Sequence, residues 1–120
     1  MSIEDKIHTE AVKKWGVPSQ VGMMVEECGE LLQALNKCYR KRGKKSQKTF
    51  VNVIEELVDV EIMIHQLKYI FNDTELYEKI KQYKLYNIAK RLDIEYTVDE
   101  QIIKDVSVLL TKWFKGDFVC

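Results

Sequence analysis

The chain has 120 residues, which suits one domain and is too short for two of ordinary size. Nineteen basic residues balance nineteen acidic ones, so no net charge draws the protein to nucleic acid or to anionic membranes. Hydrophobic residues make up 46% and charged residues 32%, a mixture that excludes a disordered chain. Five glycines and a single proline are too few for a fold of many short strands, so the composition favours long helices.

The sequence also lacks the signals of export and membrane insertion. No apolar run approaches the roughly 20 residues that a membrane-spanning helix needs. The first residues, from Met1 to Asp5, lack the basic and then apolar organisation of a signal peptide. The three cysteines, Cys28, Cys38 and Cys120, form no CxxC pair, and an odd number is a poor disulfide framework. We therefore expect a cytoplasmic protein that has reduced cysteines and binds neither nucleic acid nor a membrane.

Five helical segments are predicted, and glycine and proline separate the first two. The first covers about 2–14. Pro18 and Ser19 then open the second, which continues to about Tyr39, because proline suits a helix start and serine suits a helix cap. The basic stretch that follows, 40–45, contains a glycine and predicts a turn.

The third predicted helix covers 46–71 and is apolar on nearly all sides, which predicts that it is buried. A short polar break separates it from a fourth helix at 75–92. Thr97, with Glu100 three residues later, resembles a capping box for a fifth helix that ends near residue 115. Long helices joined by short turns predict an all-α fold, a helical bundle of about five helices.

Two pairs of acidic residues mark the second and third predicted helices. Glu27 and Glu30 are three residues apart, as are Glu56 and Asp59, so each pair lies on one face of its helix. Each pair belongs to a stripe of apolar residues at steps of three and four, the pattern of positions that face a neighbouring helix. Four carboxylates are therefore expected where core residues would pack.

Burying four like charges is prohibitively unfavourable unless something neutralises them. Mg²⁺ prefers carboxylate oxygens and shares its other positions with water and substrate phosphates, so the two pairs predict a Mg²⁺ site, with Mn²⁺ as a substitute. A di-iron bundle would need Glu-x-x-His on two helices, which His8 and His65 do not supply. The residues leave one purely structural alternative open, in which the two acidic helix faces are exposed to solvent and lysines balance their charge.

The acidic pattern resembles the signature of the MazG-like all-α nucleoside triphosphate pyrophosphohydrolases. The matching residues are Glu26-Glu27-x-x-Glu30, followed by Glu56-x-x-Asp59. Lys-Trp-Gly-Val-Pro-Ser-Gln at 14–20 and Leu-Leu-Gln-Ala-Leu-Asn-Lys at 31–37 are also similar. The resemblance covers about 10–92, which we take as the core of a single domain, 1–120. The segment 93–120 has no counterpart and is expected to be a C-terminal extension.

This resemblance implies Mg²⁺-dependent hydrolysis of ribo- or deoxyribonucleoside triphosphates to the monophosphate and pyrophosphate, which cleanses the nucleotide pool. It also implies a four-helix catalytic core completed by assembly into a homodimer or homotetramer. The implied metal ligands are Glu27, Glu30, Glu56 and Asp59. Glu26 and Glu27 would act in catalysis, with Glu26 orienting water or supporting a second metal ion.

Three residues of the fourth predicted helix, Lys84, Asn87 and Arg91, resemble the family's later helix, which carries basic residues toward the phosphates. The resemblance makes them substrate-binding residues, although their spacing alone also suits an exposed polar face. Two other functions stay open. One is a phosphoribosyl-ATP pyrophosphohydrolase, since that related group also uses paired acidic helices, and the other is a non-catalytic helical interaction protein.

Overall fold

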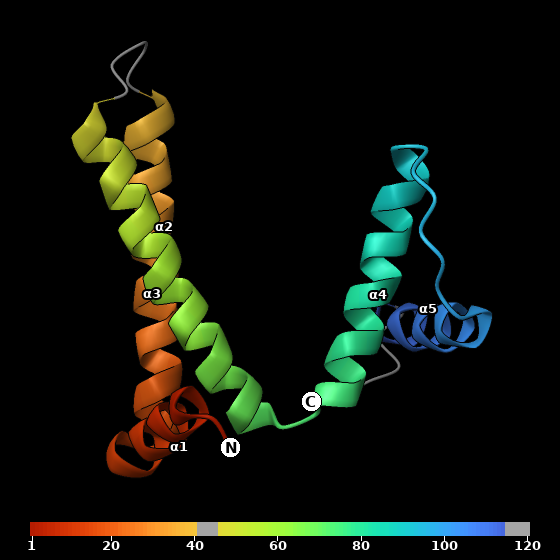
Figure 1. The fold of residues 1–120 in the computed structure, drawn as a ribbon, viewed down its shortest axis with the longest axis horizontal. Helices are drawn as coiled ribbons and strands as arrows, with labels where there is room; N and C mark the ends of the chain where they lie inside the picture. Colours follow the sequence, from red (N-terminus) through yellow and green to blue (C-terminus); the bar gives the residue numbers. More distant parts are fainter. Residues whose placement is uncertain (41–45, 115–120) are drawn as a thin grey trace. The chain divides into compact units, whose positions relative to one another are not determined.

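The computed structural model describes residues 1–40 and 46–114, without the side chains of the last two. Its helices are α1 (Ile3–Trp15), α2 (Val17–Arg40), α3 (Gln47–Phe71), α4 (Thr74–Arg91) and α5 (Glu100–Phe114) (Figure 1). The described residues contain no strand, which confirms the predicted all-α helical bundle. None of the helices in these ranges is long and apolar enough to cross a membrane. The predicted basic turn, from 41 onward, and Cys120 lie outside the described residues.

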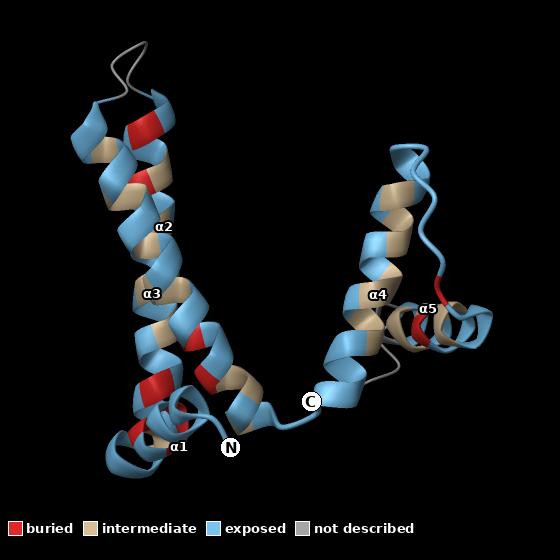
Figure 2. Cartoon of the chain, viewed as in Figure 1, coloured by how far each residue is buried: buried red, intermediate tan, exposed pale blue. Residues whose placement is uncertain are grey.

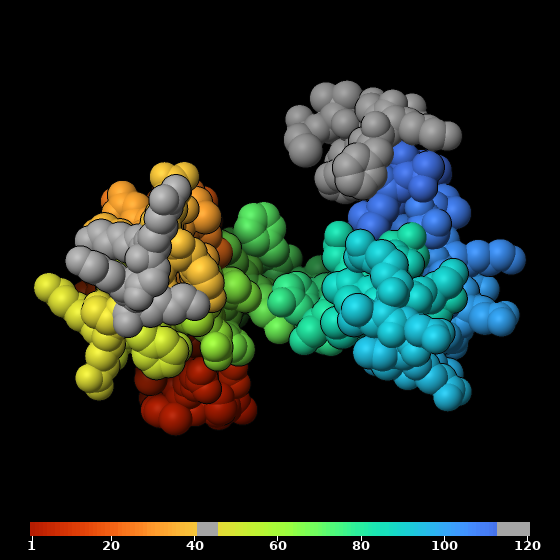
Figure 3. All heavy atoms as spheres, turned by 90° about the horizontal axis from the view of Figure 1, so that it is seen from above, coloured from red at the N-terminus to blue at the C-terminus, as the bar shows by residue number. Residues whose placement is uncertain are grey.

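The chain divides into two compact units, Met1–Asn72 and Asp73–Cys120. In the first unit α2 and α3 run side by side and make its most extensive helix contact, and α1 packs against both. Figure 1 shows α1 across the end of the pair where α2 begins and α3 ends, and Figure 3 shows it directly against them. A single domain over residues 1–120 stays a prediction.

Side chains cap α1, α3 and α4 at their first turn. Ser2 and Asp5 form a reciprocal capping box on α1, in which the Ser2 hydroxyl accepts from the Asp5 N–H at 3.0 Å. Ser46 caps α3 by accepting from the Thr49 N–H at 3.2 Å. Asp73 caps α4 by accepting from the Leu76 N–H at 3.0 Å. These bonds satisfy backbone donors that have no partner within the helix, so the start of each helix is set by its cap.

Two predicted helix starts are wrong. Ser19 is not a cap, because α2 already begins at Val17 and places this serine inside its first turn. Thr97 does not open α5 either. The Asp99 carboxylate accepts from the Gln101 N–H at 2.8 Å and so starts the helix at Glu100. A charged carboxylate next to the helix is a stronger acceptor for its free N–H groups than a hydroxyl further away.

The second unit consists of α4 packed on α5. Val98 and Val106 are its buried apolar residues among those described. Hydrogen bonds with the Asn87 and Ser107 side chains hold the pKa of the Tyr83 phenol below its ordinary value. This polar contact joins the middle of α4 to α5.

One face of α3 is exposed, although the sequence predicts burial of the whole helix. Its face toward α2 holds the buried Met63 and Gln66, but large apolar side chains elsewhere on α3 remain exposed (Figure 2). At 100° per residue they centre on the side opposite Glu56 and Asp59. We call this set the outward face of α3: Phe50, Val51, Ile54, Leu57, Val58, Ile62, Ile64, Tyr69 and Phe71.

Packing between α2 and α3 is tight at Ala34, whose side chain is only 1% exposed. We expect Ala34→Leu to lower the free energy of unfolding by about 1–3 kcal/mol, because the extra carbons force the helices apart. Urea unfolding followed by circular dichroism measures the change. Asn36→Leu, at an exposed position of the same helix, should change it by less than about 0.5 kcal/mol. Equal effects in the two variants would contradict this packing.

Candidate metal centre

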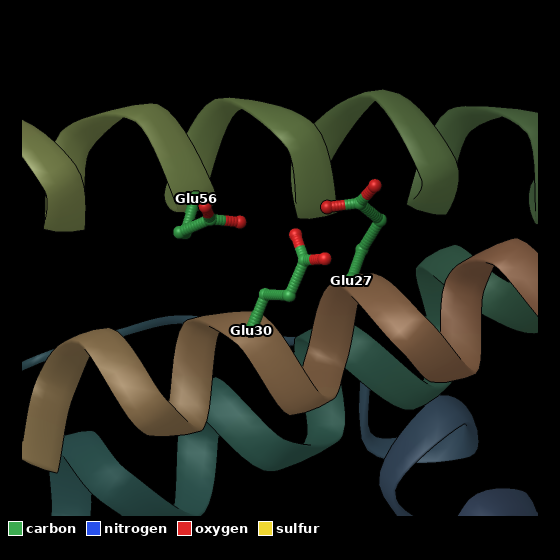
Figure 4. A group of neighbouring side chains, drawn as sticks. All are labelled: Glu27, Glu30 and Glu56. Carbon is green, nitrogen blue, oxygen red and sulfur yellow. The ribbon is translucent and has the colours of Figure 1, made fainter.

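Three carboxylates converge between α2 and α3 (Figure 4). Glu27 and Glu30 come from successive turns of α2, and Glu56 comes from α3. One oxygen of each lies within 4.8 Å of the other two. The i, i+3 spacing puts the α2 pair on one helix face, and the side-by-side packing of the two helices brings the α3 residue to it.

The burial of these carboxylates differs from one to the next. Glu27 and Glu56 are half-buried, whereas Glu30 is exposed. The Oε2 atoms of Glu27 and Glu56 are shielded from solvent and have no hydrogen-bond partner among the described residues. Buried polar atoms in folded proteins are nearly always paired with protein, ordered water or an ion, so these two oxygens are candidates for binding water or a cation.

The ionised form of the carboxylate cluster is destabilised. Burial raises the pKa of Glu27 above its ordinary value, and the neighbouring charges of Glu30 and Asp59 raise it further. The pKa of Glu56 is also raised, first by burial and then by Glu30. Protons or a hard divalent cation would relieve this repulsion, and three carboxylates with open remaining positions suit Mg²⁺.

The other two predicted residues of the acidic motif lie at the margin of this cluster. Asp59 is half-buried on α3 and is not among the three whose oxygens meet within 4.8 Å. Its charge nevertheless raises the pKa of both Glu27 and Glu56, so it acts on the same cluster. Glu26 is exposed beside Glu27 and is not in the group either. Its catalytic role and metal binding by Asp59 stay predictions.

The predicted phosphate-binding residues lie on α4 and therefore in a different unit from the acidic cluster. Lys84 and Arg91 are exposed there. Asn87 is half-buried, and its side chain is engaged with Tyr83. Substrate binding by these three residues stays a prediction.

Comparison of the chain with protein-family models, with curated proteins and with solved structures yields no match. The resemblance to the MazG-like group is therefore carried by the sequence motif alone.

Sequence reasoning missed several buried polar residues on the three helices of the first unit. Gln20 is 1% exposed on α2, and His8 and Gln66 are each 6% exposed on α1 and α3. Spacing offered a signal for two of them. Gln20 precedes Glu27 by seven residues, and Gln66 follows Asp59 by seven, so each continues the inner face of its helix.

The raised pKa values of Glu27 and Glu56 predict how the stability of the folded state changes with pH. Because the folded pKa values of Glu27 and Glu56 exceed the ordinary value of 4.5, the folded state binds more protons than the unfolded state above that pH. Their contribution to stability is therefore full below pH 4.5 and is lost as the pH rises through the raised values.

Thermal unfolding of the metal-free protein between pH 4 and pH 8 measures this loss. Replacing both Glu27 and Glu56 with glutamine should raise Tm above that of the native chain at pH 8. The difference in Tm between the variant and the native chain should be smaller at pH 4. Glu61→Gln, at an exposed position of α3, serves as the control and should follow the native chain. A difference in Tm that does not change with pH would contradict the assignment.

Proposed function

We propose that this protein is a Mg²⁺-dependent nucleoside triphosphate pyrophosphohydrolase of the MazG-like group. It would convert ribo- or deoxyribonucleoside triphosphates to the monophosphate and pyrophosphate and so cleanse the nucleotide pool. The observation that carries the proposal is the cluster of Glu27, Glu30 and Glu56, in which two shielded oxygens lack partners.

The donor set fits a hard cation. Glu27, Glu30 and Glu56 would hold Mg²⁺ or Mn²⁺, with Asp59 completing the set. The bound ion would neutralise phosphate charge and lower the pKa of a coordinated water. Half-buried carboxylates suit this binding, because a bound cation replaces the favourable interaction with water that the carboxylate charge loses on burial.

The remaining residues have roles that need no further cofactor. Glu26, exposed beside the cluster, would accept a hydrogen bond from the attacking water and hold it in line with the scissile phosphoanhydride. Lys84 and Arg91 would pair with phosphate oxygens, and Asn87 would donate from its amide. Phosphoryl transfer depends on such positioning and charge stabilisation more than on a covalent intermediate.

The outward face of α3 supports the proposed assembly into a homodimer or homotetramer. A helix that is apolar on opposite sides is typical of burial on both, and large exposed apolar patches mark interaction sites. We assign this face to a second copy of the chain. The same face would also serve a non-catalytic interaction protein, so it supports assembly without deciding between that alternative and an enzyme.

Substitution of the proposed ligands tests the enzyme. With Mg²⁺ and a panel of nucleoside triphosphates, Glu30→Gln and Asp59→Asn should each lower kcat by more than about 100-fold, because the metal loses a ligand. Separation of the products should show monophosphate and pyrophosphate with the native chain, and EDTA should abolish both. Glu61→Gln is the matched control and should retain activity.

Nearly full activity in both ligand variants would overturn the metal assignment. If the native chain turned over phosphoribosyl-ATP alone, the related pyrophosphohydrolase would replace the proposal. Absence of both turnover and nucleotide binding would favour the interaction protein.

The assembly is tested by placing charge on the outward face. Light scattering after gel filtration should show a dimer or tetramer for the native chain and a monomer for Leu57→Glu/Ile64→Glu, because association would bury the introduced carboxylates. Ile7→Glu, at an exposed apolar position of α1, should leave the mass of the assembly unchanged. A monomeric native protein, or a double variant that still assembles, would refute the assignment of this face.

A further inference from the structure

A groove of about 930 Å³ opens on the first unit, at the end of the α2–α3 pair opposite α1 (Figure 1). This volume lies within the range of small-molecule sites. Lys37, near the end of α2, and Lys48, in the first turn of α3, both line it. Asn52 and Glu55 line it from the following turns of α3. We call these four residues the lysine groove.

The lysine groove extends along α2 and α3 from the neighbourhood of the carboxylate cluster. Glu55 directly precedes Glu56, and Asn52 lies four residues before Glu56, about 6 Å of helical rise. On α2, Lys37 follows Glu30 by seven residues, nearly two turns, so both lie on one face about 10 Å apart along the axis. A ligand held at the cluster can therefore continue into the groove along either helix.

The groups that could bind such a ligand have no partner in the described part of the chain. Neither lysine forms an ion pair there, and the half-buried Asn52 amide forms no hydrogen bond there. The hydroxyls of Ser46 and Thr49 also line the groove, but they are used in the cap of α3. The Ser46 hydroxyl accepts from the Thr49 N–H at 3.2 Å, and the Thr49 hydroxyl donates to the Ser46 carbonyl at 2.9 Å. Two ammonium groups and one amide remain as donors.

The charge of the side chains changes sign along this path. The carboxylates of the cluster and of Glu55 lie at one end, and the two lysines lie at the other. Side chains on a helix lean toward its N-terminus, which on α2 is the direction of Glu30, so the four-carbon stem of Lys37 extends toward the cluster. This order of charges complements a ligand that carries a divalent cation at one end and phosphates at the other.

We propose that the lysine groove binds the β- and γ-phosphates of the nucleotide, an inference that rests on the function proposed above. Lys37 and Lys48 pair with phosphate oxygens, and Asn52 donates from its amide. In the reaction, water attacks the α-phosphorus and releases a proton to solvent. The bond from this phosphorus to the bridging oxygen breaks, and the oxygen leaves with the bonding electrons as part of pyrophosphate. The two ammonium groups stabilise the charge that develops on this leaving group, and no residue of the second unit is needed for that contact.

The double variant Lys37→Ala/Lys48→Ala tests the groove, because both side chains are exposed and alanine suits a helix. The ligand is an α,β-methylene nucleoside triphosphate with Mg²⁺, which cannot be cleaved at the scissile position. Calorimetric titration should give a Kd about 10-fold or more above that of the native chain. The Kd of the corresponding monophosphate, which lacks the terminal phosphates, should be unchanged. Lys6→Ala/Lys14→Ala, at exposed positions of α1, removes the same charge and should match the native chain for both ligands.

A ligand without a base separates this proposal from the proposed function. Inorganic tripolyphosphate with Mg²⁺ should bind to the native chain and to the α1 control variant alike. Its Kd should rise about 10-fold or more in Lys37→Ala/Lys48→Ala. Such a rise in a protein that hydrolyses no nucleoside triphosphate would support the lysine groove and overturn only the enzyme.

Other outcomes would overturn the lysine groove. Hydrolysis that Glu30→Gln abolishes, with the same KM and kcat in the native chain and in Lys37→Ala/Lys48→Ala, would refute the groove and leave the enzyme standing. Equal weakening of tripolyphosphate binding in both double variants would also refute it, because the attraction would then come from net charge rather than from a site. A native chain that binds neither tripolyphosphate nor any nucleotide would refute both proposals.

Discussion

Repulsion among carboxylates between α2 and α3 is the constraint on which the rest of the first unit depends. The two helices pack closely enough to shield oxygens of Glu27 and Glu56, yet the same contact brings Glu30 among them. Like charges this close favour protonation or a bound cation, and both glutamate pKa values are raised accordingly. The helix pair therefore carries a local cost in stability that metal binding would remove, which is typical of a functional site.

The helix α3 connects that constraint to the rest of the molecule. Its inner face carries Glu56 and Asp59 and, two turns after Asp59, the buried Gln66. Its outward face is apolar and exposed. A single helix thus carries half-buried carboxylates on the face toward α2 and exposed apolar side chains on the opposite face.

Much of the fold was predictable because helix formation depends on local features. Breaks in the pattern located the five helices of the described residues, and the spacing of Glu27 and Glu30 was enough to place them on one helix face. The errors arose where two local signals competed. Asp99, rather than Thr97, caps α5. The helix α2 begins at Val17, one residue before Pro18 and two before the predicted cap Ser19. Within one chain the outward face of α3 is exposed, because periodicity does not reveal whether a helix packs against its own chain or against another.

The sequence by itself determined the helices, the faces on which their side chains lie and the acidic pairs on two of them, since a helical period of 3.6 residues relates only near neighbours. Only the tertiary structure decided that Glu56 meets the α2 pair while Asp59 stands at the margin, and that His8 stacks on His65. These contacts join residues far apart in the chain. They depend on how whole helices pack, which is set by the summed shape and burial of many side chains rather than by any local spacing.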